Sequence, residues 1–262
     1  MIVIKSGFNP TIPLTHSRIG IDNIVRTGTV TASSETAGFP AIAAANPLTY
    51  NYWKPATLPA WWRVDAGTPK PVGYVGIASH DLGGISGTVV VEYSDDDSTW
   101  IEVDSHSPVD DSPIMFLFEP ITARYWRIVV SGTAPFVGVV YMGMPLEIER
   151  PCFSGISPIN FNRVTTIRPN ISEGGQWLGR SIIREGSKMS AQYQNLNYAW
   201  YKDNFDPFVE QSRKYPFFFA WRPDGYPETI GYVWLSDDVA PTTSGKRDLV
   251  DVSFNMTGLA IE

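Results

Sequence analysis

The sequence predicts a mainly β protein, in which an antiparallel β-sandwich precedes a smaller, mostly β or α+β domain with one short helix. Three observations lead to this prediction. Short runs that alternate apolar and polar residues recur through residues 29–148. The 21 prolines and 22 glycines are spread along the 262 residues, which suits short strands and turns better than long helices. No segment of the same region carries a sustained helical repeat of apolar positions.

The alternating runs define the strands of the predicted sandwich. Residues 61–67 (WWRVDAG), 87–94 (GTVVVEYS) and 123–132 (ARYWRIVVSG) each place apolar side chains on one face. Residues 72–79 (VGYVGIAS) form a shorter, mostly apolar run rich in strand-forming residues. The residues that share one side of their run are Trp62, Val64, Ala66, Val89, Val91, Tyr93, Trp126, Ile128 and Val130. Trp61 and Trp62, inside a strand, are both expected to pack in the core.

Three consecutive aspartates, Asp95 to Asp97, stand between two of these runs. Such a cluster could be a metal site, a catalytic acid and base, or a turn. A metal site needs further oxygen ligands, and a catalytic pair needs a pocket; the sequence signals neither. Aspartate favours turns because its side chain accepts hydrogen bonds from nearby backbone amides and tolerates left-handed backbone geometry. We therefore predict a hairpin turn.

The rest of the chain suggests an N-terminal segment and a second domain. Residues 1–28 form an extended segment that contains two prolines. Residues 150–158 (RPCFSGISP) look like a connection, so we place domains at 29–148 and 151–262. Within the second, residues 164–196 are predicted to be extended segments broken by Gly174-Gly175 and Gly186.

One helix and three strands are predicted toward the C-terminus. The helix has Asp206 as its N-cap and Pro207 at its first position. Two strands flank the turn Pro223-Asp224-Gly225, and a last strand alternates apolar residues over 248–256.

Composition limits the possible functions. The net charge of −7 argues against a nucleic-acid partner. With Cys152 as the only cysteine, neither an intrachain disulfide nor a thiolate zinc site can form. The N-terminal sequence does not read as an export signal, and no apolar run is long enough for membrane insertion.

No sequence pattern of an enzyme is present. The sequence lacks G-x-S-x-G, H-E-x-x-H, a phosphate-binding loop and G-x-G-x-x-G. Ser79, His80 and Asp81 are adjacent, but neighbours on an extended chain point apart and cannot form a triad. We expect a protein that is not an enzyme and that carries no cofactor and no metal.

Four motifs in one order resemble the discoidin-type, galactose-binding-like β-sandwich found in coagulation factors and carbohydrate-binding modules. They are TASSETAGFPAIAAANP (31–47), PAWWRVDAG (59–67), YSDDDSTWIEV (93–103) and ARYWRIVVSG (123–132). The resemblance implies an antiparallel sandwich with ligand loops at one end. The family's loop often binds calcium through an Asp-Gly turn, but Asn46-Pro47 stands here instead. We therefore do not transfer the calcium site.

The whole chain also resembles tail or baseplate proteins of tailed bacteriophages. The resemblance rests on the segments PLTHSRIG (13–20), SEGGQWLGRSIIREG (172–186) and DPFVEQSRKYPFFFAWRPDGYP (206–227). It implies a virion protein that is made and assembled in the bacterial cytoplasm, as a homo-oligomer with other tail or baseplate proteins as partners. The aromatic-rich region 198–234 is expected to meet another chain in part, the alternative being a buried core.

A candidate saccharide site follows from the aromatic residues beside the predicted ligand loops. Tyr50, Tyr52 and Trp53 could offer ring faces to a sugar of the host surface, with His80 and Asp81 as hydrogen-bonding partners. The alternative is that these rings close the end of the sandwich or meet a neighbouring subunit. The competing class of function is a free-standing or accessory carbohydrate-binding protein outside any virion.

Overall fold

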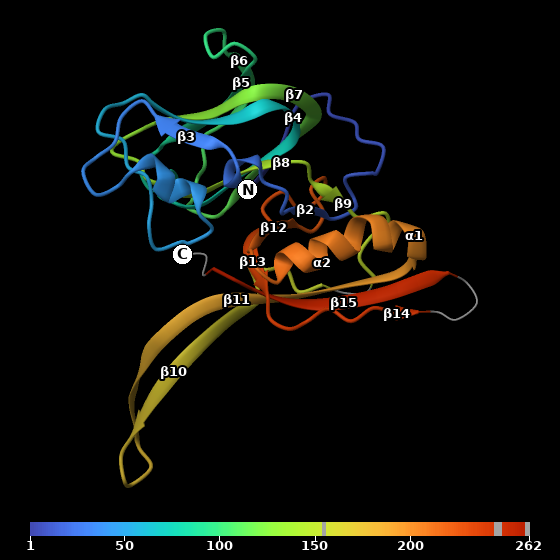
Figure 1. Ribbon diagram of the computed structural model, residues 1–262. Coiled ribbons are helices and arrows are strands. Elements are labelled where there is room, and N and C mark those ends of the chain that lie inside the picture. The colour runs from blue at the N-terminus through green and yellow to red at the C-terminus, as the bar shows by residue number, and fades with distance from the viewer. Residues whose placement is uncertain (154–155, 244–247, 260–262) are drawn as a thin grey trace.

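The computed structural model describes residues 1–153, 156–243 and 248–259 (Figure 1). These residues form two sheets of seven and eight strands, in which all pairs except one are antiparallel, together with two short 3₁₀ turns and one longer helical segment. The predicted fold class, mainly β with an antiparallel sandwich, is confirmed.

The seven-stranded sheet forms the sandwich, and its order is β3-β4-β7-β5-β6, with β8 paired to β4 and β1 paired in parallel to β7. β4 and β7 are long and bent. Register shifts at Asp65/Lys70 and Val72/Tyr74 let them curve, so their two halves lie in opposite layers around one core. The strands are β1 (Ile2–Ile4), β3 (Thr29–Ala32), β4 (Ala60–His80), β5 (Thr88–Ser94), β6 (Ile101–His106), β7 (Ile114–Ser131) and β8 (Val137–Gly143).

The core of the sandwich contains the alternating residues that the sequence predicts. Ala66 and Tyr93 are partly buried and pack against it. The others are fully buried: Trp62, Val64, Val89, Val91, Trp126, Ile128 and Val130. The period of two places every second side chain inside, which confirms the predicted faces. The same period places Trp61 on the outer face, where it is only partly buried and the Arg63 guanidinium lies 5.1 Å from its ring centroid, so the expectation that Trp61 packs in the core is wrong.

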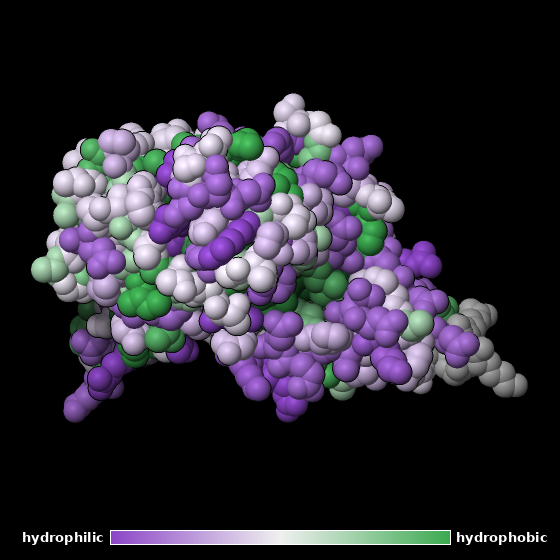
Figure 2. Space-filling view, turned by 45° about the horizontal axis from the view of Figure 1, so that its top comes forward, coloured by the Kyte–Doolittle hydropathy of each residue, from purple (hydrophilic) through white to green (hydrophobic). Residues whose placement is uncertain are grey.

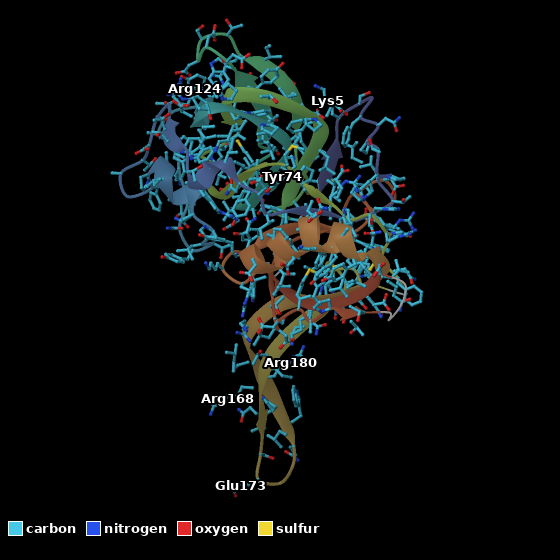
Figure 3. All side chains as sticks on the ribbon, turned by 45° about the vertical axis from the view of Figure 1, so that its right-hand side comes forward. Lys5, Tyr74, Arg124, Arg168, Glu173 and Arg180 are labelled. Carbon is cyan, nitrogen blue, oxygen red and sulfur yellow. The ribbon has the colours of Figure 1, made fainter. Side chains whose placement is uncertain are left out.

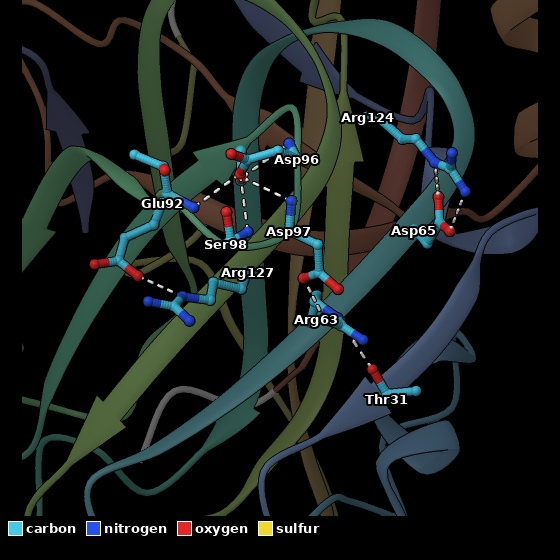
Figure 4. A network of polar contacts seen from close by, with 11 residues as sticks. Thr31, Arg63, Asp65, Glu92, Asp96, Asp97, Ser98, Arg124 and Arg127 are labelled. Carbon is cyan, nitrogen blue, oxygen red and sulfur yellow. Dashed lines mark hydrogen bonds and ion pairs between the residues drawn. The ribbon is translucent and has the colours of Figure 1, made fainter.

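The three aspartates form the turn between β5 and β6, and Figure 4 shows the contacts of Asp96 and Asp97. Asp96 Oδ1 accepts hydrogen bonds from the backbone amides of Ser98 at 2.9 Å and Thr99 at 2.8 Å. These donors hold the pKa of Asp96 well below its usual range. Asp97 has the left-handed φ of 62° and forms an ion pair with Arg63 across the sheet. The prediction of a hairpin turn is confirmed.

The eight-stranded sheet has the order β10-β11-β15-β13-β12-β2-β9, with β14 paired to β15. Its strands are β2 (Arg18–Gly20), β9 (Leu146–Glu147), β10 (Arg163–Ile171), β11 (Trp177–Asn197), β12 (Phe217–Ala220), β13 (Ile230–Leu235), β14 (Thr242–Thr243) and β15 (Leu249–Gly258).

The N-terminal segment, residues 1–28, is shared between the two sheets. β1 lies beside β7 in the sandwich, whereas β2 pairs with β12 in the second sheet. A short 3₁₀ turn, η1 (Ile24–Arg26), follows and is capped by the side chain of Asn23. The predicted boundary near residue 150 stays a prediction, and residues 154–155 of the expected connection lie outside the described part of the chain.

Strands β12 and β13 are buried on both faces and join the two halves of the molecule. Phe217 and Phe219 face the core under the helix, while Phe218 and Tyr232 face the sandwich. The sandwich contributes Tyr74, among others, to this second contact. Two-sided burial explains why residues 216–221 read as a continuous apolar run rather than as an alternating one.

The helical segment starts earlier than the sequence predicts. It consists of α1 (Tyr198–Trp200), a π-helical turn η3 (Tyr201–Phe205) and α2 (Asp206–Ser212). Asn197 caps it by accepting from the amides of Ala199 and Trp200. Asp206 is therefore not the N-cap. Because Pro207 has no N–H and its ring crowds the carbonyl four residues back, the wider π turn before it accommodates the ring inside a continuous helix.

The expectation that region 198–234 meets another chain stays a prediction. Most of its large aromatic side chains fill the cores, since Tyr201, Phe205, Phe208, Phe217, Phe218, Phe219 and Tyr232 are buried, whereas Tyr198, Tyr226 and Trp234 are exposed. Figure 2 shows one face of the molecule as mostly hydrophilic and neutral, with small separate hydrophobic patches. The buried-core alternative describes most of this region.

Strands β10 and β11 form a long hairpin that projects away from the body (Figures 1 and 3). Its turn contains Gly174 and Gly175, the latter at a φ of 79°, as the predicted break requires. Gly186 does not break the chain, because it pairs with Val164 inside the ladder. We call residues 163–186 the arm, since β11 joins β15 only from Ser187 onward.

Candidate functional site at the loop end of the sandwich

Three loops of the sandwich meet at one end and are tied together by hydrogen bonds. Ser79 Oγ donates to the carbonyl of Thr49 at 2.9 Å, which joins residues 46–53 to the loop that follows β4. Asp81 Oδ1 accepts from the amide of Phe136 at 2.7 Å, which adds the loop before β8. The loop around Tyr50 therefore lies beside SHDLGG, as the discoidin resemblance implies.

Trp53 lies inside the core of the sandwich and not on its surface. It has no exposed surface, and its backbone exchanges two hydrogen bonds with Val137. Its Nε1–H donates to the carbonyl of Ser34 at 3.0 Å. The indole ring is therefore enclosed by the core, and its N–H already has a partner. This corrects the expectation that a sugar contacts Trp53.

His80 is also buried, with 3% of its surface exposed. Its Nε2 lies 3.0 Å from the carbonyl of Ser112, and its Nδ1 accepts from the amide of Leu82 at 3.3 Å. These contacts fit the neutral imidazole with the proton on Nε2. Burial lowers the pKa of His80 to about 4. The side chain holds two loops together, which corrects its expected role as a sugar ligand.

The buried His80 makes stability depend on pH. Because its folded pKa lies below its unfolded value, the unfolded chain binds the proton first as the pH falls. Stability is then full above the unfolded pKa and is lost toward the folded one, by about 2–3 kcal/mol between pH 7 and 4.5. We expect urea unfolding of His80→Gln to lose less stability than wild type over this window, because Gln does not titrate. If the free energy of unfolding falls equally with pH in wild type and in His80→Gln, His80 is not a buried neutral imidazole.

Asp81 is partly buried and links the loop that follows β4 to the loop before β8. Its carboxylate oxygen accepts the Phe136 amide described above, and burial raises its pKa against the effect of that bond. The predicted residue is therefore at the loop end, but its bonding atom faces the protein.

The two tyrosines differ in how much of each ring is free. Phe39 stacks on Tyr52 with ring centroids 4.8 Å apart, and Phe136 packs against the same ring at 4.5 Å. Tyr50 has 78% of its surface exposed and has no aromatic neighbour in these contacts. Of the aromatic residues that the sequence predicts, Tyr50 offers the freest ring face.

A pocket of about 470 Å³ opens beside Tyr50, between η1, the second 3₁₀ turn η2 (Ala41–Ala45) and residues 46–52. Apolar atoms come from the turn η2 and the aromatic rings, and polar groups come from one arginine and two asparagines. Its principal lining residues are Arg26, Phe39, Ile42, Asn46, Tyr50, Asn51 and Tyr52.

Two polar groups in this pocket are suited to bind a neutral polar ligand. Arg26 is fixed, because its Nη2 donates to the carbonyl of Ile21 at 2.9 Å and its guanidinium stacks on Tyr215 at 4.0 Å. The Asn51 Oδ1 is buried and accepts no hydrogen bond from the described residues. A buried acceptor without a partner costs free energy, so a donor from a ligand or water is favoured there.

Sequence reasoning missed Arg26, Ile42 and Asn51. Asn51 stands between the two predicted tyrosines and could have been included from its position alone. Arg26 precedes the resembling motifs, and only the fold of residues 1–28 onto the sandwich brings it to this pocket. No periodicity or motif marks it.

A metal site is not formed by the part of the chain that the structure covers, since it holds no group of three or more His, Cys, Asp or Glu side chains placed for a metal ion. None of the helices described is long and apolar enough to cross a membrane.

Comparisons with known proteins concern the sandwich. Residues 29–140 match the model of the F5/8 type C domain. No curated protein matches the chain.

Similar solved structures cover less than half of this chain. The chitosan-binding module 1 of a chitosanase/glucanase from Paenibacillus sp. IK-5 is 24% identical, with 47% of this chain and 98% of that chain covered and a TM-score of 0.41. A pectin-binding carbohydrate-binding module is 17% identical. The match covers 44% of this chain and 89% of that chain, with a TM-score of 0.40.

A module from Clostridium perfringens, in complex with GalNAc-β-1,3-galactose, is 14% identical. The match covers 47% of this chain and 100% of that chain, with a TM-score of 0.42. The residues that match the F5/8 type C domain, 29–140, contain strands β3 to β7 and part of β8 of the antiparallel β-sandwich.

Proposed function

We propose that the chain is a structural component of a bacteriophage tail tip or baseplate whose sandwich binds saccharides weakly at the loop end. The observation that carries the saccharide part is the pocket beside Tyr50, which combines an exposed ring with a fixed guanidinium and an unpartnered amide oxygen. Sugars present both apolar faces and hydroxyl groups, so this mixture suits them. The sandwich type supports the same proposal.

Affinity at one such site is low. A ring stacked on a sugar contributes on the order of 1 kcal/mol, and each hydrogen bond adds about 0.5–1.5 kcal/mol net. A total near −4 kcal/mol corresponds to a Kd of about 1 mM. Several linked copies on one particle raise the overall affinity by about 10²–10⁴. Weak sites are therefore consistent with attachment by an oligomer.

Tyr50→Ala is the sharpest test of the saccharide site. We expect it to weaken binding about tenfold, because it removes the exposed ring and leaves the fold intact. The full chain is screened on a glycan array, and the strongest glycan is titrated by NMR. Tyr198→Ala, which removes a half-exposed ring from the other half of the molecule, is the matched control. Absence of wild-type binding at ~10 mM glycan, or unchanged binding by Tyr50→Ala, would overturn the saccharide proposal.

A second candidate is a free-standing or accessory carbohydrate-binding protein, which shares the sandwich and needs no assembly. The arm favours an assembly, because it exposes apolar side chains that a solitary module would not need. Detection of the protein in purified virions supports the tail component. Its absence from virions that retain their other tail proteins, together with glycan binding, favours the accessory role.

A further inference from the structure

The arm has one mainly apolar face, which we call its apolar face, and one polar face. Residues directly opposite in an antiparallel ladder share a face, and Ile167 pairs with Ile182 while Ile171 pairs with Trp177. Pro169 lies on the same face, between these pairs, and so does Arg180, its partner across the ladder. On the other face the pairs are polar: Thr166 with Arg184, Arg168 with Ser181, and Asn170 with Gly179.

Nothing in the described chain covers the apolar face. Ile182 is 52% exposed and Trp177 62% exposed, and the bulged residues Leu178 and Ile183 are exposed as well. Neither β10 nor the arm part of β11 has a second strand neighbour among the described strands. A two-stranded hairpin alone is marginally stable in water, and half-buried sheets cover their apolar face with a partner.

Charge identifies a partner for this face. The arm carries four Lys and Arg against two Asp and Glu, a net charge of +2. The sandwich, residues 29–148, carries five Lys and Arg against thirteen Asp and Glu, a net charge of −8. Two arms would repel each other, whereas an arm and a sandwich attract.

The acidic residues of the sandwich gather on its β5–β6 hairpin. Residues 92–104 contain six carboxylates, of which Glu92 and Asp97 are paired with arginines of the same sheet. Asp95 and Glu102 are exposed and make no ion pair in the described structure. β6 is also an edge strand, and Ile101 on it is half exposed.

The arm and the β5–β6 hairpin point to opposite ends of the molecule (Figure 1). Arg168 and Arg180 lie far along the arm, and Glu173 marks its tip (Figure 3). An arm therefore does not reach the acidic hairpin of its own chain. A contact between the two surfaces has to join different copies.

We propose that the apolar face of the arm packs on the sandwich of a second copy, with Arg180 of that face against the carboxylates of that copy's β5–β6 hairpin. The contact uses two different surfaces, so it is heterologous and builds a closed ring or an open filament. This inference deepens the proposed oligomeric role by naming the two surfaces. It holds whether or not the assembly is a virion.

A charge-swap experiment tests the proposal on the full chain. Sedimentation and light scattering at about 100 µM are expected to show an oligomer that dissociates as salt rises. Arg180→Glu should shift it toward monomer, and Asp95→Lys with Glu102→Lys should do the same. Combining all three changes should restore the oligomer, because each surface again meets its opposite charge. Asp203→Lys with Glu210→Lys, exposed acids on the helical segment, is the control and should leave it unchanged.

The apolar face has its own variant. Trp177→Ser with Ile182→Ser should abolish the oligomer, while Tyr198→Ser should not. Circular dichroism checks that each variant is folded. A wild-type monomer at this concentration overturns the proposal. So does an oligomer that survives both arm variants, although that result leaves the proposed oligomeric role standing. A monomer that binds anionic lipid vesicles through Trp177 would assign the arm to a membrane surface instead.

Discussion

Replacing Phe218 by alanine is expected to lower the free energy of unfolding by about 3–5 kcal/mol, the range for deleting a buried aromatic side chain. The ring has no exposed surface and lies where the second sheet meets the sandwich. It packs edge-on against Tyr141 at 5.6 Å and tilted against Tyr232 at 5.0 Å. On its other side it approaches the backbone of Gly76, where an added Cβ would lie 2.6 Å from the ring.

The cavity that Phe218→Ala leaves cannot close easily, because β4 on one side and β12 on the other are fixed by their ladders. Urea unfolding followed by tryptophan fluorescence measures the loss. Phe153→Ala removes a ring that is 52% exposed and should change stability by less than about 0.5 kcal/mol. A loss below about 1 kcal/mol in Phe218→Ala would mean that the two halves do not share this core.

Trp53→Ala should destabilise the protein by a similar amount, about 3–5 kcal/mol. The substitution empties a fully buried site, and it leaves the Ser34 carbonyl without its indole donor at 3.0 Å. The loop that carries Tyr50 then loses its anchor. Any loss of glycan binding in this variant would follow from the altered fold, so it does not test direct contact.

Comparison with Tyr50→Ala separates the two roles. Tyr50 is three residues away and 78% exposed, so its removal should leave stability within about 0.5 kcal/mol of wild type. Thermal unfolding monitored by circular dichroism compares both variants. If Trp53→Ala unfolds at the wild-type temperature, Trp53 does not anchor the loop end.

The sequence by itself determined the local structure of the sandwich. Alternation around Trp62 and Trp126 specified which faces turn inward, because side chains of a strand point to opposite sides with a period of two. The aspartates at 95–97 specified a turn, because their bonds reach only a few residues along the chain. Four ordered motifs gave the sandwich type, since they retain the spacing of its strands.

The tertiary structure alone decided which of the predicted site residues reach the surface. Tyr50, Tyr52 and Trp53 stand within four positions, yet one is exposed, one is stacked and one is buried. That difference depends on Val137 and Phe136, which lie more than 80 residues away. The arm's uncovered apolar face and the place of Arg26 likewise follow from strand pairing and long-range packing. The pattern of neighbouring residues in the sequence cannot predict these contacts, because each depends on a partner that is distant in the chain.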